Sequence, residues 1–297
     1  MRHLDRGGRG AYRRAMTHAD PAPTRVQPPI GRDTRLCMSL SARPGNFGSR
    51  FHNRLYALTG LDYVYKAFST SDLAGAVGGI RALNIRGCAI SMPFKEAVIA
   101  LLDGLAPSAA AIDSVNTIVN DDGVLTGHNT DYAAVAALIA DIDPATRFVL
   151  RGSGGMAKAV AAALRDAGFR DGTIVARNQG AGRPLADLYG FAWQGDLADD
   201  ARAAMLINVT PMGMTGADAD VLAFPPAMIA AADAVLDVVQ YPPETPLLRS
   251  AAAAGKRCIT GTEVAVLQAL EQFVLYTGVR PDDAQVADAA AFARAHG

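Results

Sequence analysis

The sequence predicts an α/β protein of two domains. From residue 35 onward, short apolar runs typical of buried strands alternate with amphipathic runs typical of helices. A glycine cluster at 152–155 lies between one such strand and one such helix, and the 297 residues exceed what one compact core usually holds. Half of the residues are apolar, so a sizeable core can be buried.

The composition argues against several classes of function. The net charge of −1 gives no general attraction to nucleic acid or to an anionic membrane. No apolar run approaches the roughly 20 residues that a membrane-spanning helix needs. Cys37, Cys88 and Cys258 are widely spaced and form no CxxC pair. This spacing argues against a disulfide framework or a metal site, and it favours a cytoplasmic location.

Residues 1–33 differ from the rest of the chain. They are rich in arginine and proline and contain few large apolar residues, so they cannot bury enough surface to offset their ordering entropy. We expect a disordered tail, or a stretch that precedes the true start of the protein, with Met16 as an internal candidate start.

The elements of the first half follow in order. Strands are expected at 35–40, 63–68, 87–92 and 117–120, the last of them in a hairpin whose turn is Asp121-Asp-Gly123. Helices are expected at 51–59, stopped by Gly60, at 72–83, with Ser71 as a candidate N-cap, and at 93–102, opened by Pro93.

The second half repeats the alternation. Strands are expected at 147–150, 172–177, 205–209, 234–238 and 257–260, and helices at 131–142, 156–167, 263–276 and 281–296.

The glycine cluster reads Gly152-Ser153-Gly154-Gly155-Met156. Glycine permits a tight turn and lets backbone amides approach a pyrophosphate, and the following helix presents its unpaired N–H groups to that anion. Glycine loops also serve as ordinary turns between a strand and a helix, but the position inside a βαβ unit favours a dinucleotide site.

The next strand ends at Ala176-Arg177-Asn178. Units that bind NAD usually carry an acidic residue there to hold the ribose 2′-hydroxyl, whereas a guanidinium can pair with a 2′-phosphate. A solvated surface arginine is the alternative, but it does not account for the missing carboxylate. The sequence therefore favours NADP as the cofactor.

Lys95 and Asp131 are the candidate catalytic residues. Lys95 follows a strand end, where α/β proteins gather their sites, and the predicted helix at 93–102 would place it where the helix dipole lowers the pKa of a cation. A depressed pKa suits proton transfer. Asp131 begins a predicted helix, and a role as its N-cap is as plausible as catalysis; Asn129 or Thr130 could cap equally well. His128 is more often structural in such a turn.

The motifs together resemble the shikimate/quinate dehydrogenase family. Matching segments occur in the family's order over nearly all of 35–280: Ser91-Met-Pro-Phe-Lys95, Ser114-Val-Asn116-Thr, Asn129-Thr-Asp131, Gly152-Ser-Gly-Gly155, Ile207-Asn-Val-Thr210 with Gly213, Asp237 with Thr245-Pro246, and 261–268. The loop at 42–53 is most similar to that of the divergent shikimate dehydrogenase-like subgroup.

The resemblance implies a fold and a set of roles. It implies a substrate domain at 34–130, completed by helices at 262–297, and a Rossmann-type NADP-binding domain at 131–261, separated by a cleft. It also implies an oxidoreductase of aromatic amino acid biosynthesis that interconverts shikimate and 3-dehydroshikimate, with Lys95 and Asp131 as the proton-transfer pair. The remaining implied residues line the substrate pocket (Asn46, Ser49, Ser91, Asn116 and Gln268) or hold the dinucleotide (Gly152, Ser153, Gly154, Gly155, Met156, Arg177, Asn178, Thr210, Val238 and Gly261).

Two departures from the family affect substrate recognition. The family's His-Ser-x-Ser-Pro run reads Asn46-Phe-Gly-Ser49-Arg here, and the family's pocket tyrosine falls at Gln240, with Tyr241 one place along. We therefore expect weak shikimate turnover or a preference for a related hydroxy acid. A quinate or other polyol-acid dehydrogenase, and an NADP-binding sensor with residual activity, are the alternatives. The partner is a small molecule, and a homodimer is left open.

Overall fold

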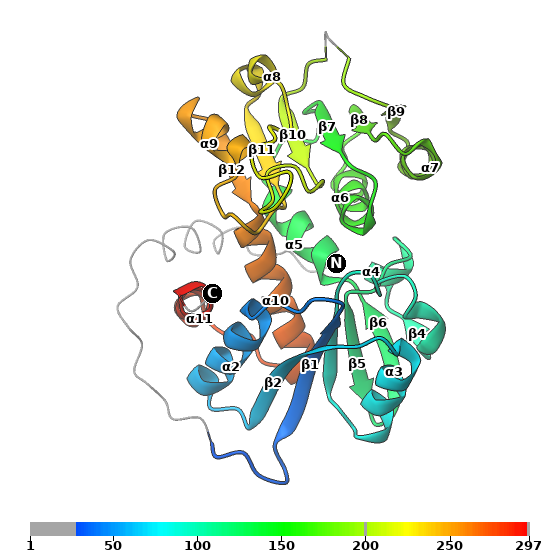
Figure 1. The fold of residues 1–297 in the computed structure, drawn as a ribbon, viewed down its shortest axis with the longest axis vertical. Coiled ribbons are helices and arrows are strands. Elements are labelled where there is room, and N and C mark those ends of the chain that lie inside the picture. Colours follow the sequence, from blue (N-terminus) through cyan, green and yellow to red (C-terminus); the bar gives the residue numbers. More distant parts are fainter. Residues whose placement is uncertain (1–27, 199–200, 296–297) are drawn as a thin grey trace. The chain divides into compact units, whose positions relative to one another are not determined.

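A computed structural model of the chain describes residues 28–198 and 201–295. The chain divides into two compact units (Figure 1), which are described separately below. The first unit contains the described residues up to Ala109, then Val115–His128 and the chain from Ala269 onward; the second contains Ala110–Ser114 and Asn129–Gln268. The division falls at 128/129 and 268/269, where the sequence predicts 130/131 and 261/262. Most of the predicted tail, 1–27, lies outside the described residues.

The first unit is built on a six-stranded mixed sheet with the order β2-β1-β3-β5-β6-β4. Strands β1, β2 and β3 are parallel, and β5 runs antiparallel to both β3 and β6. The strands are β1 (Arg35–Ser41), β2 (Tyr63–Ser69), β3 (Gly87–Ile90), β4 (Gly104–Leu105), β5 (Thr117–Asp121) and β6 (Val124–His128). The helices are α2 (Phe47–Thr59), α3 (Leu73–Ala82), the 3-10 helix η1 (Ile99–Leu101), α4 (Pro107–Ala110), which ends at the boundary with the second unit, and α11 (Asp283–Ala295).

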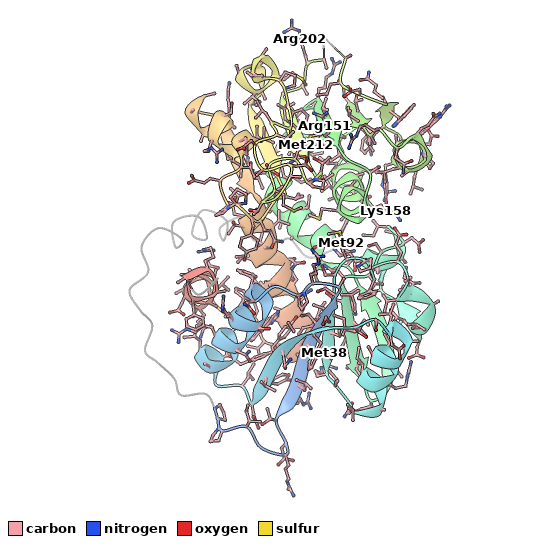
Figure 2. The ribbon with its side chains drawn as sticks, in the orientation of Figure 1. Met38, Met92, Arg151, Lys158, Arg202 and Met212 are labelled. Atoms are coloured by element: carbon pink, nitrogen blue, oxygen red, sulfur yellow. The ribbon has the colours of Figure 1, made fainter. Side chains whose placement is uncertain are left out.

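Helices cover both faces of this sheet. On one face, Met38 and Cys88 (Met38 is labelled in Figure 2) lie in a core with Val77 and Ile80 of α3. On the other face, Tyr276 of α10 (Gly261–Thr277) packs so closely on Gly87 that a Cβ there would lie 2.1 Å from the tyrosine ring. The expected α/β architecture of this unit is confirmed.

Side chains of α2 bind the backbone of β2. Asn53 accepts a hydrogen bond from the Tyr65 amide (2.9 Å) and donates one to the Tyr65 carbonyl oxygen (2.8 Å). The Ser49 hydroxyl accepts a third from the Ala67 amide (3.1 Å). Because strand β2 has only β1 as a neighbour, these contacts satisfy backbone groups on its other side.

The predicted helix at 93–102 is wrong. After β3, the chain makes a cis Met92–Pro93 peptide, then successive turns, and only Ile99–Leu101 is helical, as one 3-10 turn. The reason is tertiary, because the Lys95 carbonyl oxygen accepts a hydrogen bond from the Val115 amide (2.8 Å) instead of serving a helix. Lys95 therefore does not lie in the first turn of a helix, as the prediction required.

The other predicted elements of this unit are present with small shifts. Asp72, and not Ser71, caps α3, since its carboxylate accepts from the Gly75 amide (2.8 Å). The β5–β6 hairpin turns at Asp122 and Gly123, whose φ angles of 51° and 92° belong to the left-handed region.

The second unit is built on a parallel six-stranded sheet with the order β12-β11-β10-β7-β8-β9. Numbered from β7, this is the 3-2-1-4-5-6 order of a doubly wound Rossmann sheet, so the predicted fold is confirmed. The strands are β7 (Phe148–Arg151), β8 (Gly172–Val175), β9 (Ala192–Gln194), β10 (Met205–Asn208), β11 (Ala234–Asp237) and β12 (Arg257–Thr260). The helices are α5 (Thr130–Ile139), α6 (Gly155–Asp166), α7 (Gln179–Tyr189), α8 (Pro226–Ala231) and α9 (Pro246–Ala253), together with the first half of α10.

Alternate strand residues bury two cores. Leu150, Ile174, Ile207 and Leu236 face a core that includes residues of α5, α6 and α7. Their neighbours along the strands face a second core that includes residues of α8 and α9. Both faces of the sheet are therefore covered, as a parallel sheet requires. Within 28–198 and 201–295, no helix is long and apolar enough to span a bilayer.

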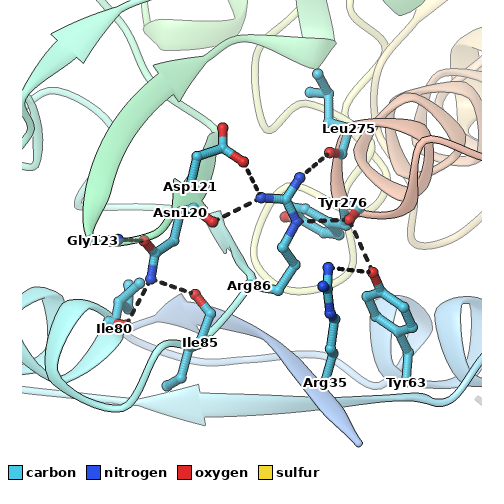
Figure 3. A network of polar contacts seen from close by, with 10 residues as sticks. All are labelled: Arg35, Tyr63, Ile80, Ile85, Arg86, Asn120, Asp121, Gly123, Leu275 and Tyr276. Carbon is cyan, nitrogen blue, oxygen red and sulfur yellow. Dashed lines mark hydrogen bonds and ion pairs between the residues drawn. The ribbon is translucent and has the colours of Figure 1, made fainter. Parts of the chain in front are cut away.

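Arg86 fastens the end of α10 to the sheet of the first unit (Figure 3). Its guanidinium donates to the carbonyl oxygens of Leu275 (3.4 Å), Tyr276 (2.8 Å) and Asn120 (2.7 Å), and it pairs with Asp121. The last carbonyl groups of a helix lack partners within the helix. Arg86 therefore supplies a C-terminal cap that only a planar, multidentate donor can provide.

Replacing Arg86 by lysine should lower the free energy of unfolding by about 1.5 kcal/mol, because a single ammonium cannot reach all of these oxygens. Urea denaturation of the purified protein measures this. Arg35→Lys is the matched control, since Arg35 is exposed and its side chain contacts Tyr63, with a 3.3 Å bond to the hydroxyl and the guanidinium 5.9 Å from the ring centroid. Equal stability of the two variants would contradict the capping role.

Candidate functional site

The glycine loop in the second unit connects β7 to α6. Gly152 has a φ of +126°, and a Cβ on it would lie 2.7 Å from Val209 Cγ2, so only glycine fits. Gly154 is the N-cap of α6, makes no side-chain cap bond, and has open space at its Cβ position. The first backbone amides of α6 therefore have no side-chain cap, and the space beside Gly154, beyond the end of β7, is open. Uncapped amides at a helix start suit a pyrophosphate.

Arg177 and Asn178 follow β8 at the neighbouring strand end. Arg177 is exposed. Arg151, the last residue of β7, is labelled in Figure 2. Burial lowers the pKa of Arg151, Asp196 opposes this shift, and the positive charge of Arg177 adds to it. Asn178 is the N-cap of α7, with its side-chain oxygen accepting from the Ala181 amide (3.3 Å). Arg177 can thus offer a guanidinium to a phosphate, while Asn178 shapes the turn beside it.

A buried polar network fixes the loops after β10 and β11. The Asp237 carboxylate accepts from the Asn208 amide group (3.0 Å), the Val239 amide (3.1 Å) and the Thr245 hydroxyl (2.6 Å). Burial raises the pKa of Asp237, and these hydrogen bonds oppose the shift. The Thr210 hydroxyl in turn donates to Asn208 Oδ1 (2.6 Å). Thr210 is therefore held in place by Asn208, the last residue of β10, a role that sequence reasoning missed because it assigned Asn208 only to a buried strand.

Val238 and Gly261 are brought together at the start of α10. A Cβ on Gly261 would lie 2.2 Å from the Val239 carbonyl oxygen and 2.6 Å from the Val238 carbonyl carbon. The helix start thus packs directly on the backbone that follows β11. The family resemblance assigned both residues to the dinucleotide site, and the close packing explains why residue 261 is glycine.

Asp131 and Gln268 are the other candidates in the second unit. Asn129 is the N-cap of α5, since its side-chain oxygen accepts from the Tyr132 amide (3.2 Å). Asp131 lies in the first turn and is only 5% exposed. Of the two roles considered for Asp131, the N-cap is therefore taken by Asn129. Gln268 is partly buried on α10.

In the first unit, Ser91, Lys95 and Asn116 are gathered by backbone hydrogen bonds. The Ile90 amide donates to the Asn116 carbonyl oxygen (2.7 Å), next to the bond between Lys95 and Val115. Ser91 lies in the exposed turn after β3, and its amide donates to Leu40 (3.0 Å). Lys95 is half-buried, and Asn116 is 1% exposed.

Asn46 and Ser49 lie at the start of α2. Asn46 is the exposed N-cap residue and makes no side-chain cap bond. The hydroxyl of Ser49 already accepts the Ala67 amide, so this serine ties α2 to β2. Sequence reasoning assigned Ser49 to the substrate alone, because the pairing of residues 49 and 67 leaves no local signal.

Two histidines in this unit have depressed pKa values. Burial lowers the pKa of His128, which lies at the end of β6, and Asp121 partly opposes this. Burial lowers the pKa of His52 to about 3, with Gln272 acting in the opposite direction. His52 is fully buried and stacks on Tyr65 with ring centroids 4.4 Å apart. It is neutral at physiological pH and belongs to the core. In the described part of the chain, no cluster of three or more His, Cys, Asp or Glu side chains could hold a metal ion.

Known proteins resemble the chain over most of its length. A family model described as the shikimate dehydrogenase substrate binding domain matches residues 47–118. The shikimate dehydrogenase-like protein of Haemophilus influenzae is 53% identical over 268 residues, which are 89% of this chain and 98% of the relative. The NADP(+) shikimate dehydrogenase of Moorella thermoacetica is 37% identical over 245 residues, which are 76% of this chain and 82% of the relative.

Solved structures share the fold. A shikimate 5-dehydrogenase from Thermus thermophilus, in complex with NADP(H) and shikimate, superposes with a TM-score of 0.78 at 30% identity, covering 87% of this chain and 99% of that chain. A quinate dehydrogenase from Corynebacterium glutamicum, in complex with NAD, gives the same TM-score at 29% identity, covering 86% of this chain and 98% of that chain.

Proposed function

The chain belongs to the shikimate dehydrogenase family, and from this premise we propose that it is an NADP-dependent oxidoreductase of shikimate or a close hydroxy acid. The observation that carries the proposal is the pair of strand ends in the second unit. The glycine-lined start of α6 after β7 suits a pyrophosphate, and the exposed Arg177 after β8 suits a 2′-phosphate. The residues present fit NADP.

The reaction removes a hydride from one carbon of the substrate and a proton from the hydroxyl group on that carbon. NADP⁺, when bound, supplies the hydride acceptor. Lys95 and Asp131 take up the proton of the hydroxyl as the carbon–oxygen double bond forms, and they return it in the reverse direction. Ser91, Asn116 and Gln268 bind the remaining polar groups of the acid, so shikimate would give 3-dehydroshikimate.

The entrance to the substrate site supports a preference other than shikimate. Of the two serines in the family's His-Ser-x-Ser-Pro run, at most Ser49 is kept, with Asn46 as a candidate substitute, and the hydroxyl of Ser49 already accepts a bond from β2. The pocket tyrosine is replaced by Gln240. These changes leave the proton-transfer residues in place, so turnover persists with altered recognition of the acid.

A panel of acids tests the function. Shikimate, quinate and related hydroxy acids are each incubated with NADP⁺ or NAD⁺, and reduction of the cofactor is measured by absorbance. We expect NADP⁺ to be preferred and shikimate to be a poor substrate. The similarity to a quinate dehydrogenase makes quinate the second candidate substrate. NADP⁺ binding without turnover of any acid would instead identify a sensor. Turnover of shikimate as fast as by a standard family member would contradict the altered recognition.

Arg177 should determine the choice of cofactor. Arg177→Ala is expected to raise the Kd for NADP⁺ about tenfold, because the 2′-phosphate loses an ionic hydrogen bond worth about 1.4 kcal/mol. The Kd for NAD⁺ should not change. Titration calorimetry measures both constants. Arg183→Ala is the control, since Arg183 is also exposed but lies within α7; an equal effect of both variants would refute a specific phosphate contact.

A further inference from the structure

A chain of buried hydrogen bonds ends at Asn116. Gln272 on α10, Thr117 on β5 and Asn116 itself are 3%, 0% and 1% exposed. Gln272 Nε2 donates to the Thr117 hydroxyl (3.1 Å) and, at 3.4 Å, to the Asn116 carbonyl oxygen. The Thr117 hydroxyl donates to Asn116 Oδ1 (2.8 Å). All three residues belong to the first unit.

The direction of these bonds is fixed at one end by the backbone. A carbonyl oxygen can only accept, so the side chain of Gln272 must turn its Nε2 group, and not its oxygen, toward Asn116 and Thr117. The Thr117 hydroxyl then accepts from Gln272 and has one proton left to donate. That proton is given to Asn116 Oδ1, so the Nδ2 group of Asn116 is turned away from Thr117.

Gln272 lies next to a buried aromatic cluster. Its neighbour on α10, Phe273, is fully buried and lies with Tyr65 and Tyr276 around His52, with ring centroids 4.4 to 6.3 Å from that of His52. The backbone of Asn116 is also fixed, because its amide donates to His128 (3.0 Å) and its carbonyl oxygen accepts from Ile90. The hydrogen bonds that run from Gln272 through Thr117 to Asn116 are called the relay below. The relay connects an aromatic core to one side-chain amide.

We propose that Gln272 and Thr117 are positioning residues that orient the Asn116 amide as a hydrogen-bond donor to the substrate. This deepens the proposed function and rests on it for the identity of the ligand. The group of the substrate at Asn116 is then an acceptor, a hydroxyl or carboxylate oxygen. Neither positioning residue touches the substrate; each acts through Asn116.

Paired substitutions at Thr117 test the relay. Thr117→Val keeps the shape and removes the hydroxyl, and it should raise the KM for the best acid of the panel at least tenfold while kcat and the KM for NADP⁺ change less than threefold. Thr117→Ser restores the hydroxyl and should return the KM to within twofold of wild type. Gln272→Met should raise the KM by a smaller factor, because the bond from Thr117 to Asn116 remains. Thr59→Val and Gln285→Met make the same chemical changes elsewhere in this unit and should leave all constants unchanged.

A second readout does not depend on turnover. In ligand-free protein labelled with ¹⁵N-asparagine, the side-chain amide signals of Asn116, assigned with Asn116→Ala, should shift in Thr117→Val and keep their positions in Thr117→Ser. Unmoved signals in Thr117→Val, or a parallel loss in kcat and in NADP⁺ affinity, would overturn the proposal. Should Thr117→Val fail to fold, Gln272→Met decides by the same two readouts. Wild-type protein inactive on every acid of the panel would refute the proposed function, and the amide signals would still decide the role of Thr117 and Gln272.

Discussion

Replacing Lys95 by alanine is expected to lower kcat by a factor of about 10² to 10⁴, the usual contribution of a residue that moves a proton in the transition state. The rate is measured with the best acid of the panel. The Kd for NADP⁺ should not change, because the glycine loop and Arg177 belong to the second unit and Lys95 to the first. The fold should also persist, since the bond that fixes residue 95 to Val115 uses the backbone carbonyl.

Lys95→Arg separates charge from chemistry. Arginine keeps the positive charge but does not release its proton near neutral pH, so this variant should be nearly as slow as the alanine variant. Glu96→Gln is the neighbouring control and should retain most of the activity, because Glu96 is exposed in the same turn. An arginine variant with wild-type kcat would show that Lys95 provides only charge, and proton transfer would then have to be assigned to another group.

Gly261→Ala is expected to destabilise the second unit by about 3 kcal/mol, at the upper end of the usual cost of overpacking. The added Cβ would lie 2.2 Å from a backbone oxygen, and the backbone after β11 cannot move easily because Asp237 holds the Val239 amide. Calorimetry should record a lower Tm, and NADP⁺ should bind more weakly to the folded fraction.

Gly78→Ala is the matched control for this change. Gly78 lies inside α3, and no atom lies within 4 Å of its Cβ position, so alanine should be neutral or stabilising there. If Gly261→Ala melted at the same temperature as wild type, the close packing of α10 on residues 238–239 would be refuted.

The sequence predicted those parts of the fold that have a local signature. The glycine loop, the hairpin turn at Asp122–Gly123 and the buried strands were all found because backbone geometry or apolar runs demand particular residues. Helix α7 was not expected, since Pro184 and two glycines weaken its helical pattern. The segment 93–102 had a helical pattern, but the tertiary bond between Lys95 and Val115 prevails there.

The resemblance predicted which residues belong to the candidate site, but not which side chains form hydrogen bonds with them. The resemblance named Asn116 and Thr210, yet the side chains that hold them, Thr117 and Asn208, were not expected to do so. Ser49 illustrates the same limit, because its partner at Ala67 lies 18 residues away on a different element. Hydrogen bonds between elements depend on how the elements pack, which periodicity and spacing do not encode.

The α2 side chains that form hydrogen bonds with the β2 backbone also affect how copies of this protein can associate. An outer strand with unpaired amides is a template onto which another chain can add a strand. Here Asn53 and Ser49 already occupy the amides of Tyr65 and Ala67, and the opposite border of the sheet is the two-residue β4. Self-assembly by intermolecular β-extension is therefore disfavoured at both borders of this sheet, and a dimer would have to form through other surfaces.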